Sequence, residues 1–169
     1  MRNRFFLATL LIISCAQKQE AGKEDPIKIA TPYDYEGVQW FKGKGNGNIR
    51  GRAQFRSKHG DIRFGKGFRI ELMPYCHYTE ERLSIIYGDE KAGYVFLEEG
   101  IPQFTPDPEG YHDTKKAICN AYGEFEFKDL PSGDYYLVAF MLWDGTGGGI
   151  MRKVTLSEGE SKFIAMLNY

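Results

Sequence analysis

This 169-residue chain contains only three cysteines, three histidines and two tryptophans. Three cysteines are too few for a disulfide scaffold. The 22 lysines and arginines nearly balance the 23 acidic residues, so no excess of positive charge indicates a nucleic-acid partner. No apolar run reaches the roughly 20 residues that a membrane-spanning helix needs. The small number of cysteines argues against a disulfide-rich scaffold, and the balance of charges argues against nucleic-acid binding.

Catalytic motifs are also missing. The chain contains no Gly-x-Ser-x-Gly nucleophile elbow and no His-Glu-x-x-His metal motif. Cys76, His77, His59 and His112 are candidate metal ligands, but Cys76 and His77 are adjacent, and a strand would point them to opposite faces. We therefore expect no metal, no cofactor and no enzymatic activity. Residues 77–116 are the segment in which a catalytic site would have to lie.

The first fifteen residues have the pattern of an export signal. Arg2 and Arg4 precede an apolar run at residues 5–13, which is too short to span a bilayer. The run ends in Ile12-Ile13-Ser14-Cys15, which resembles the lipobox of bacterial lipoproteins. That resemblance implies cleavage before Cys15 and attachment of lipid, including palmitate, to its thiol. The alternative is an ordinary signal peptide with an incidental cysteine.

This interpretation divides the chain into three parts. Residues 1–14 form the signal peptide, residues 15–32 a lipidated polar tether, and residues 33–169 a folded domain. Several acyl chains would hold the protein to a membrane almost irreversibly. Ala16 follows the cysteine where some inner-membrane lipoproteins have Asp, so the resemblance implies the outer membrane of a bacterial cell envelope. The periplasmic or surface orientation stays open.

The folded domain is patterned as β-structure. Residues 124–128 alternate between aromatic and charged side chains, Pro131-Ser132-Gly133 has turn chemistry, and residues 135–142 are apolar on both faces, as in a central strand. Further strands are predicted at 48–56, 62–64, 68–73, 94–97, 115–121, 150–155 and 163–167. Residues 79–87 form a helix or a loop, residues 100–114 a long loop, and residues 144–149 a wide, flexible hairpin connection.

Two stretches, residues 47–75 and 117–167, are similar to the carboxypeptidase regulatory-like domain. The similarity is carried by Leu72-Met73-Pro74 and by Gly123-x-Phe-x-Phe-x-x-Leu-Pro-x-Gly-x-Tyr135. It implies an all-β, Ig-like or transthyretin-like antiparallel sandwich of about seven strands. A long insertion then separates the second strand from the hairpin at 124–142. Cys119-Asn120 departs from the Thr-Asp that the family often has.

Cys76 and Cys119 flank predicted core strands, and exported compartments permit disulfides. With Cys15 used for lipid, the two remaining thiols could form one bridge. A bridge that encloses about 44 residues would add roughly 4 kcal/mol of stability on the chain-entropy model. The alternative is a pair of buried free thiols.

Charge is unevenly distributed along the domain. Residues 50–69 contain seven basic residues and one acidic residue, whereas residues 79–113 contain two basic and nine acidic residues. These segments form either ordinary solvated surfaces or binding surfaces. The candidate ligand-binding residues are three tyrosines of the insertion and three basic residues of the first strand region: Tyr75, Tyr78, Tyr87, Arg52, Arg56 and Lys58.

These observations predict a non-catalytic, lipid-anchored envelope protein. Its sandwich would serve as a protein-interaction or structural accessory module, which is the role that the family resemblance implies. The alternative function is carbohydrate or peptidoglycan binding. The expected partners are the membrane, through the N-terminal lipid, and an envelope protein or a cell-wall glycan.

Overall fold

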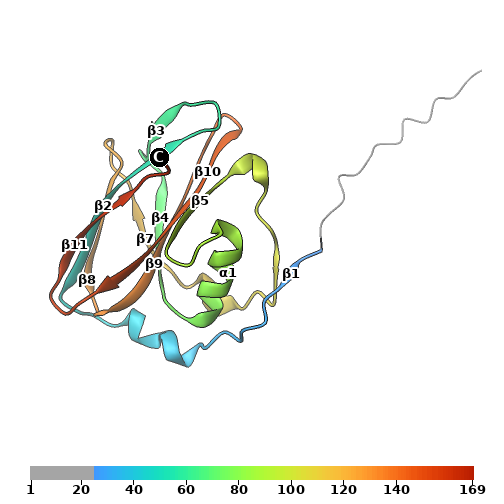
Figure 1. Cartoon of the computed structure of the whole chain (residues 1–169). Coiled ribbons are helices and arrows are strands. Elements are labelled where there is room, and N and C mark those ends of the chain that lie inside the picture. Colours follow the sequence, from blue (N-terminus) through green and yellow to red (C-terminus); the bar gives the residue numbers. More distant parts are fainter. Residues whose placement is uncertain (1–24) are drawn as a thin grey trace, which may run out of the picture.

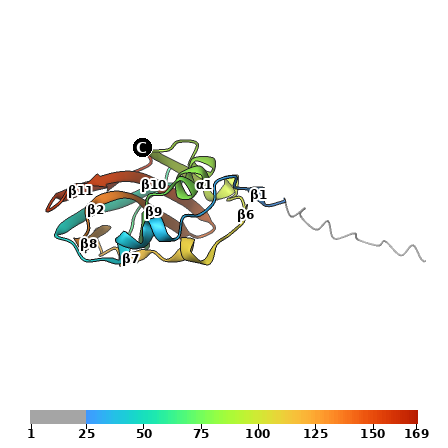
Figure 2. The ribbon, with the colours of Figure 1, turned by 90° about the horizontal axis from the view of Figure 1, so that it is seen from below.

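The computed structural model describes residues 25–169, and these residues fold into three layers (Figures 1 and 2). The predicted signal peptide, Cys15 and residues 15–24 of the tether lie outside the described residues. Two β-sheets form a sandwich, and a helix with irregular segments covers the outer face of one sheet. No helix among residues 25–169 is long and apolar enough to cross a bilayer. The two sheets confirm the predicted all-β sandwich, to which the helix and the irregular segments add a third layer.

Eleven strands are defined within the described part of the chain. They are β1 (Ile27–Lys28), β2 (Gly47–Arg56), β3 (Ile62–Phe64), β4 (Arg69–Pro74), β5 (Ala92–Phe96), β6 (Phe104–Thr105), β7 (Lys115–Ile118), β8 (Glu124–Leu130), β9 (Gly133–Trp143), β10 (Thr146–Leu156) and β11 (Ser161–Met166). The helices are α1 (His77–Tyr87) and short 3₁₀ turns at Glu36–Lys42, Leu97–Glu99 and Glu109–His112.

One sheet has the strand order β5-β10-β9-β4-β7, and every neighbouring pair in it is antiparallel. In the other sheet β2 pairs with β11, β8 and β3. The β2–β11 pair is parallel, so this sheet is mixed rather than purely antiparallel as predicted. β9 lies in the centre of the first sheet, in agreement with its apolar sequence.

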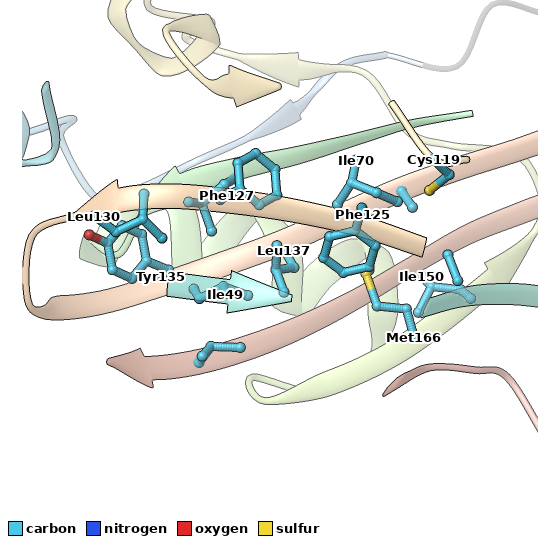
Figure 3. Packing of buried hydrophobic residues seen from close by; sticks show 14 of the residues in the cluster. Ile49, Ile70, Cys119, Phe125, Phe127, Leu130, Tyr135, Leu137, Ile150 and Met166 are labelled. Atoms are coloured by element: carbon cyan, nitrogen blue, oxygen red, sulfur yellow. The ribbon is translucent and has the colours of Figure 1, made fainter. Parts of the chain in front are cut away.

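The main core lies between the two sheets. Alternate residues of β2 are buried, among them Ile49, Ala53 and Phe55, while the intervening residues face outward. Figure 3 shows Ile49, Phe125 and Phe127 facing Leu137 and Ile150 across the sandwich. Period-two alternation in the sequence therefore identifies the buried face correctly.

The segment 124–142 is not a hairpin. β8 pairs with β2, whereas β9 pairs with β4 and β10, so the turn at Pro131 carries the chain from one sheet to the other. The Tyr135 hydroxyl donates a hydrogen bond to the Pro131 carbonyl over 2.6 Å, and its ring packs against Trp40. A turn between strands looks the same in sequence whether or not the strands pair.

The glycine-rich stretch 144–149 is also not a wide, flexible connection. β9 and β10 are joined by a two-residue turn, Asp144-Gly145, in which both residues have positive φ, 48° and 78°. Such turns match the twist of paired strands. Strand β10 includes Gly147, Gly148 and Gly149. These positions are occupied by glycine because neighbouring atoms leave no room for a side chain. A Cβ at Gly148 would lie 2.0 Å from the Val95 carbonyl oxygen.

The folded body begins earlier than the predicted boundary at residue 33. β1 pairs in parallel with β6, and the side chain of Ile29 is buried. The Glu81 carboxylate of α1 accepts hydrogen bonds from the backbone N–H groups of Ala30 and Thr31. Residues 27–31 therefore belong to the third layer and not to a free tether.

Candidate functional site

A cavity of about 380 Å³ lies between the outer face of the five-stranded sheet and the third layer. Met73 of β4 and Val138 of β9 are buried residues that line it from the sheet. Leu83, Ile86 and Tyr87 line it from α1. Its volume falls near the lower end of the roughly 300–1,000 Å³ range of small-ligand pockets.

Helix α1 is held over the sheet by a second apolar cluster. Tyr78, Leu83 and Tyr87 of the helix are buried against Tyr136 and Val138 of β9. The helix ends at Gly88, which adopts the left-handed conformation (φ 72°) that glycine favours at this position. Of the two alternatives left open for residues 79–87, a helix or a loop, the helix is correct, and α1 begins earlier, at His77.

Aromatic side chains form much of the remaining wall. Phe104 and Tyr111 come from the segment after α1, and Phe140 comes from β9. Tyr111 packs edge-on against Tyr78, with ring centroids 5.4 Å apart. The prediction of a long loop at 100–114 is refined here, because the segment includes β6 and the turn at Glu109–His112.

One charged cluster lies on the sheet side of the cavity. Arg69 and Glu71 are two residues apart on β4, so their side chains leave the same face of the strand. The Arg69 Nε is 2.8 Å from Glu71 Oε1, and the Thr114 hydroxyl donates a hydrogen bond to Glu71 Oε2 over 3.1 Å. All three residues line the cavity. The cluster therefore offers both donors and acceptors.

A second charged cluster lies on the opposite wall. Arg82 of α1 pairs with Asp107 and donates a hydrogen bond to the Tyr78 hydroxyl. Its guanidinium lies 4.8 Å from the ring centroid of Phe104 and 4.3 Å from that of Tyr111. Burial is the largest single influence and lowers the pKa of Arg82, but the interactions with Asp107, Tyr111 and Tyr78 together outweigh it, so the net shift of the pKa is upward. Arg82 thus stays charged while it holds the segment 104–112 against α1.

The Tyr87 hydroxyl is buried and has no hydrogen-bond partner among the described residues. Burial raises the pKa of Tyr87, so the hydroxyl keeps its proton. A Cβ at Gly149 would lie 2.8 Å from this hydroxyl and 2.7 Å from the Phe140 ring. The glycine in β10 therefore makes room for the tyrosine that lines the cavity.

The predicted tyrosines gather around α1, but they have different roles. Tyr87 lines the cavity, and Tyr78 is fully buried behind it with its hydroxyl donating to the Pro106 carbonyl over 2.6 Å. Tyr75 lies at the other end of the helix, where its hydroxyl donates to Glu80 over 3.0 Å.

The predicted basic residues lie away from the cavity, and each already has a partner. Arg52 pairs with Glu124 over 2.9 Å, and Lys58 pairs with Glu99 over 3.1 Å. The Arg56 guanidinium lies 4.7 Å from the ring centroid of Tyr169. The structure therefore does not bring these three basic residues together with the predicted tyrosines.

The expected bridge between Cys76 and Cys119 is not formed, and both are free thiols. Cys119 lies beside the first residue of β4, since its backbone N–H donates a hydrogen bond to the Phe68 carbonyl. Cys76 lies beyond the other end of that strand, two residues after Pro74. A six-residue strand spans about 20 Å. Disulfide geometry requires Cα atoms within about 7 Å, so the two cysteines lie too far apart.

The candidate metal ligands are also dispersed. Cys76 and His77 lie at the start of α1, His59 in the turn between β2 and β3, and His112 near Asp107. Among residues 25–169 no three histidine, cysteine or acidic side chains are grouped to hold a metal ion.

Sequence reasoning missed most of the cavity residues. Arg69 and Glu71 were recognised only as the polar members of a strand, and Thr114 and Tyr111 as parts of a loop. A usable signal was present in β4, where polar residues alternate with the buried Ile70 and Leu72 and so had to share one face. Which segment covers that face depends on tertiary packing.

Comparison with known proteins gives a likeness to solved structures but none to known sequences. No protein-family model matches the chain, and no curated protein sequence matches it. A crystal structure of a proposed carbohydrate-binding protein from Pseudomonas aeruginosa aligns with a TM-score of 0.64 and 22% identity, covering 85% of this chain and 100% of that chain. At this identity the likeness concerns the fold. The chain therefore shares the β-sandwich architecture of that protein, and the carboxypeptidase regulatory-like resemblance stays a prediction.

Proposed function

We propose that the protein is a lipid-anchored, non-catalytic carbohydrate-binding module of the bacterial cell envelope. The cavity between α1 and the sheet carries this proposal, because it combines aromatic walls with the Arg69–Glu71 ion pair and with the guanidinium of Arg82. Sugars present C–H faces that pack on aromatic rings and hydroxyl groups that both donate and accept hydrogen bonds. The ascription of carbohydrate binding to the P. aeruginosa protein of similar fold supports the same ligand class.

The anchoring part of the proposal comes from the sequence. Cys15 and the apolar run before it predict lipidation, and residues 27–31 then lead directly into the third layer. A flexible tether of about a dozen residues would have an end-to-end distance on the order of 20 Å, which would keep the start of the folded body close to the membrane surface. The module would thereby be concentrated where envelope glycans occur.

A binding experiment with a filled cavity tests the proposal. The full chain in detergent micelles is titrated with neutral hexose, N-acetylhexosamine and uronate oligosaccharides, which should include at least one ligand. Thr114→Trp places an indole in the cavity wall and should abolish binding. Thr155→Trp is the matched control, because Thr155 is exposed on β10, does not line the cavity and also bonds a carboxylate, that of Asp134.

Two results would contradict the proposal. If the wild-type protein binds none of these oligosaccharides, the carbohydrate-binding function is wrong. If Thr114→Trp binds as tightly as wild type, the cavity is not the site. Circular dichroism of both variants confirms that they retain the β-sandwich.

A second candidate function, protein interaction, is favoured by one surface. An open groove of about 670 Å³ beside β7, β8 and β11 is lined in part by Ile118 and Phe163, each 64% exposed. Photo-crosslinking from position 118 in intact cells should capture a stoichiometric envelope protein, whereas position 155 should not. Equal labelling from both positions would contradict the interaction surface.

A further inference from the structure

We infer that the cavity receives the terminal unit of a neutral glycan, and that Glu71 and Arg69 read two adjacent hydroxyl groups of that unit. The inference rests on the carbohydrate-binding function proposed above and specifies which carbohydrate the site takes. It depends on the size of the cavity, on the balance of its charges and on the geometry of β4.

The size of the cavity limits its occupant. About 380 Å³ accommodates one or two sugar rings but not a longer stretch of chain. The sheet closes it below through Met73 and Val138, and α1 with Tyr111 covers it above. A covered cavity of this size admits the end of a glycan, whereas the middle of a polymer would need an extended groove.

The charges of the cavity favour a neutral ligand. Arg69 and Glu71 line the cavity as an ion pair, and Arg82, which also lines it, is paired with Asp107, which lies outside the lining and is contacted by His112 as well. Each arginine of the lining therefore already has an acidic partner. A ligand carboxylate or amine would have to compete with an existing ion pair for its arginine or its carboxylate. Neutral hydroxyl groups add hydrogen bonds without breaking either pair.

The sheet-side cluster is arranged to read a pair of hydroxyl groups. Glu71 accepts hydrogen bonds only, and the Arg69 guanidinium donates only. Their contact over 2.8 Å places an acceptor beside a donor, so one sugar hydroxyl can donate to the carboxylate while its neighbour accepts from the guanidinium. The bond from Thr114 fixes the other carboxylate oxygen before a ligand arrives, which lowers the entropy lost on binding.

The experiment compares chain lengths and charges on the full-length protein in micelles. The probes are di-, tetra- and hexasaccharides of one neutral sugar that the protein binds, with the uronate disaccharide as the charged counterpart. Recognition of a chain end predicts that the three neutral probes bind within about threefold of one another. The uronate disaccharide should bind at least about tenfold more weakly.

Substitutions test whether Glu71 and Arg69 contribute directly to affinity rather than to the stability of the fold. Glu71→Gln should weaken disaccharide binding by about tenfold, the effect expected on losing a charge-assisted hydrogen bond. Glu124→Gln is the matched control, because Glu124 also pairs with an arginine on a strand but lies on the other sheet, and it should change affinity less than twofold. Arg69→Gln provides a second test at an exposed residue, where the substitution leaves the core untouched.

The outcomes distinguish this inference from the broader function. Affinity that rises steeply with chain length, tight binding of the uronate, or unchanged binding by both Glu71→Gln and Arg69→Gln would overturn the inference, and the protein would still bind carbohydrate. Failure of the wild-type protein to bind any carbohydrate would instead overturn the proposed function.

Discussion

Two tyrosines of helix α1 differ in one respect that decides what their hydroxyl groups contribute. Tyr78 and Tyr87 are both buried, but the Tyr78 hydroxyl donates to the Pro106 carbonyl and accepts from Arg82. The Tyr87 hydroxyl has no partner within the described residues. A buried polar group without a partner costs about 1–3 kcal/mol of desolvation. The unpaired hydroxyl is therefore a local cost to stability beside the cavity.

Removing the two hydroxyl groups one at a time should have different effects on the free energy of unfolding. Tyr87→Phe should leave the free energy of unfolding unchanged or raise it by about 1 kcal/mol, because it removes a buried hydroxyl that bonds no other described residue. Tyr78→Phe should lower it by about 1–3 kcal/mol, because the Pro106 carbonyl and Arg82 lose a partner. Urea denaturation followed by tryptophan fluorescence measures both. Equal destabilisation by the two substitutions would contradict this account.

The sequence identified these tyrosines as candidate ligand-binding residues, but it could not show which of them lines the cavity. Tyr75, Tyr78 and Tyr87 have the same chemistry, and only the packing of the segment 104–112 against α1 separates them. The basic residues show the same limit. Arg52 and Lys58 formed a positive run in the sequence, but their acidic partners Glu124 and Glu99 lie far away along the chain.

At the level of elements, strand periodicity predicted most of the sandwich. β2, β4, β8 and β9 lie close to where alternation or continuous apolar character placed them, and so does the second half of β10. The glycines at 147–149 were misread as a loop, because flexibility and close packing both use glycine. The contacts at Gly148 and Gly149 show that close packing decides here.

The turn between β9 and β10 gives a prediction about conformation alone. Gly145 has φ 78° and open space around its Cβ position. Gly145→Ala should lower stability by about 1–2 kcal/mol, because the left-handed conformation is costly for alanine. Thermal unfolding measures the effect.

Asp144→Gly is the control for that substitution. Asp144 also has positive φ, 48°, so glycine should fit there without loss of stability. Its contact with Arg63 spans 3.8 Å between exposed groups and adds little. A stable Gly145→Ala variant would mean that the turn adopts another conformation.

For the molecule as a whole, the sequence predicts anchoring through a residue outside the described part of the chain. Cys15→Ser should move the protein from the membrane pellet to the soluble fraction, because the thiol that carries the lipid is removed. Cys76→Ser is the matched control and should stay in the pellet, since Cys76 is a free thiol within the fold. Fractionation of cells followed by immunoblotting measures both. A Cys15→Ser protein that stays in the pellet contradicts the anchor.

The fold class was predictable from the whole chain, but the third layer was not. Binary patterning determines which faces of the sheets are apolar, and β9 is apolar on both of its faces. That pattern implies a cover over the second face. It does not say that residues 77–114 provide the cover, or that they leave a cavity lined by Glu71.

The short parallel ladder between β1 and β6 links the start of the folded body to a wall of the cavity. Its backbone bonds, Ile27 to Gln103 over 2.8 Å and Ile29 to Thr105 over 2.9 Å, join the incoming chain to the segment that contains Phe104. A mechanical load on the chain before Ile27 reaches this ladder before it reaches the sandwich. In the lipid-anchored protein proposed above, tension on the chain before Ile27 would therefore act first on the cavity wall that contains Phe104. Ligand binding and membrane attachment would then depend on the same few backbone bonds.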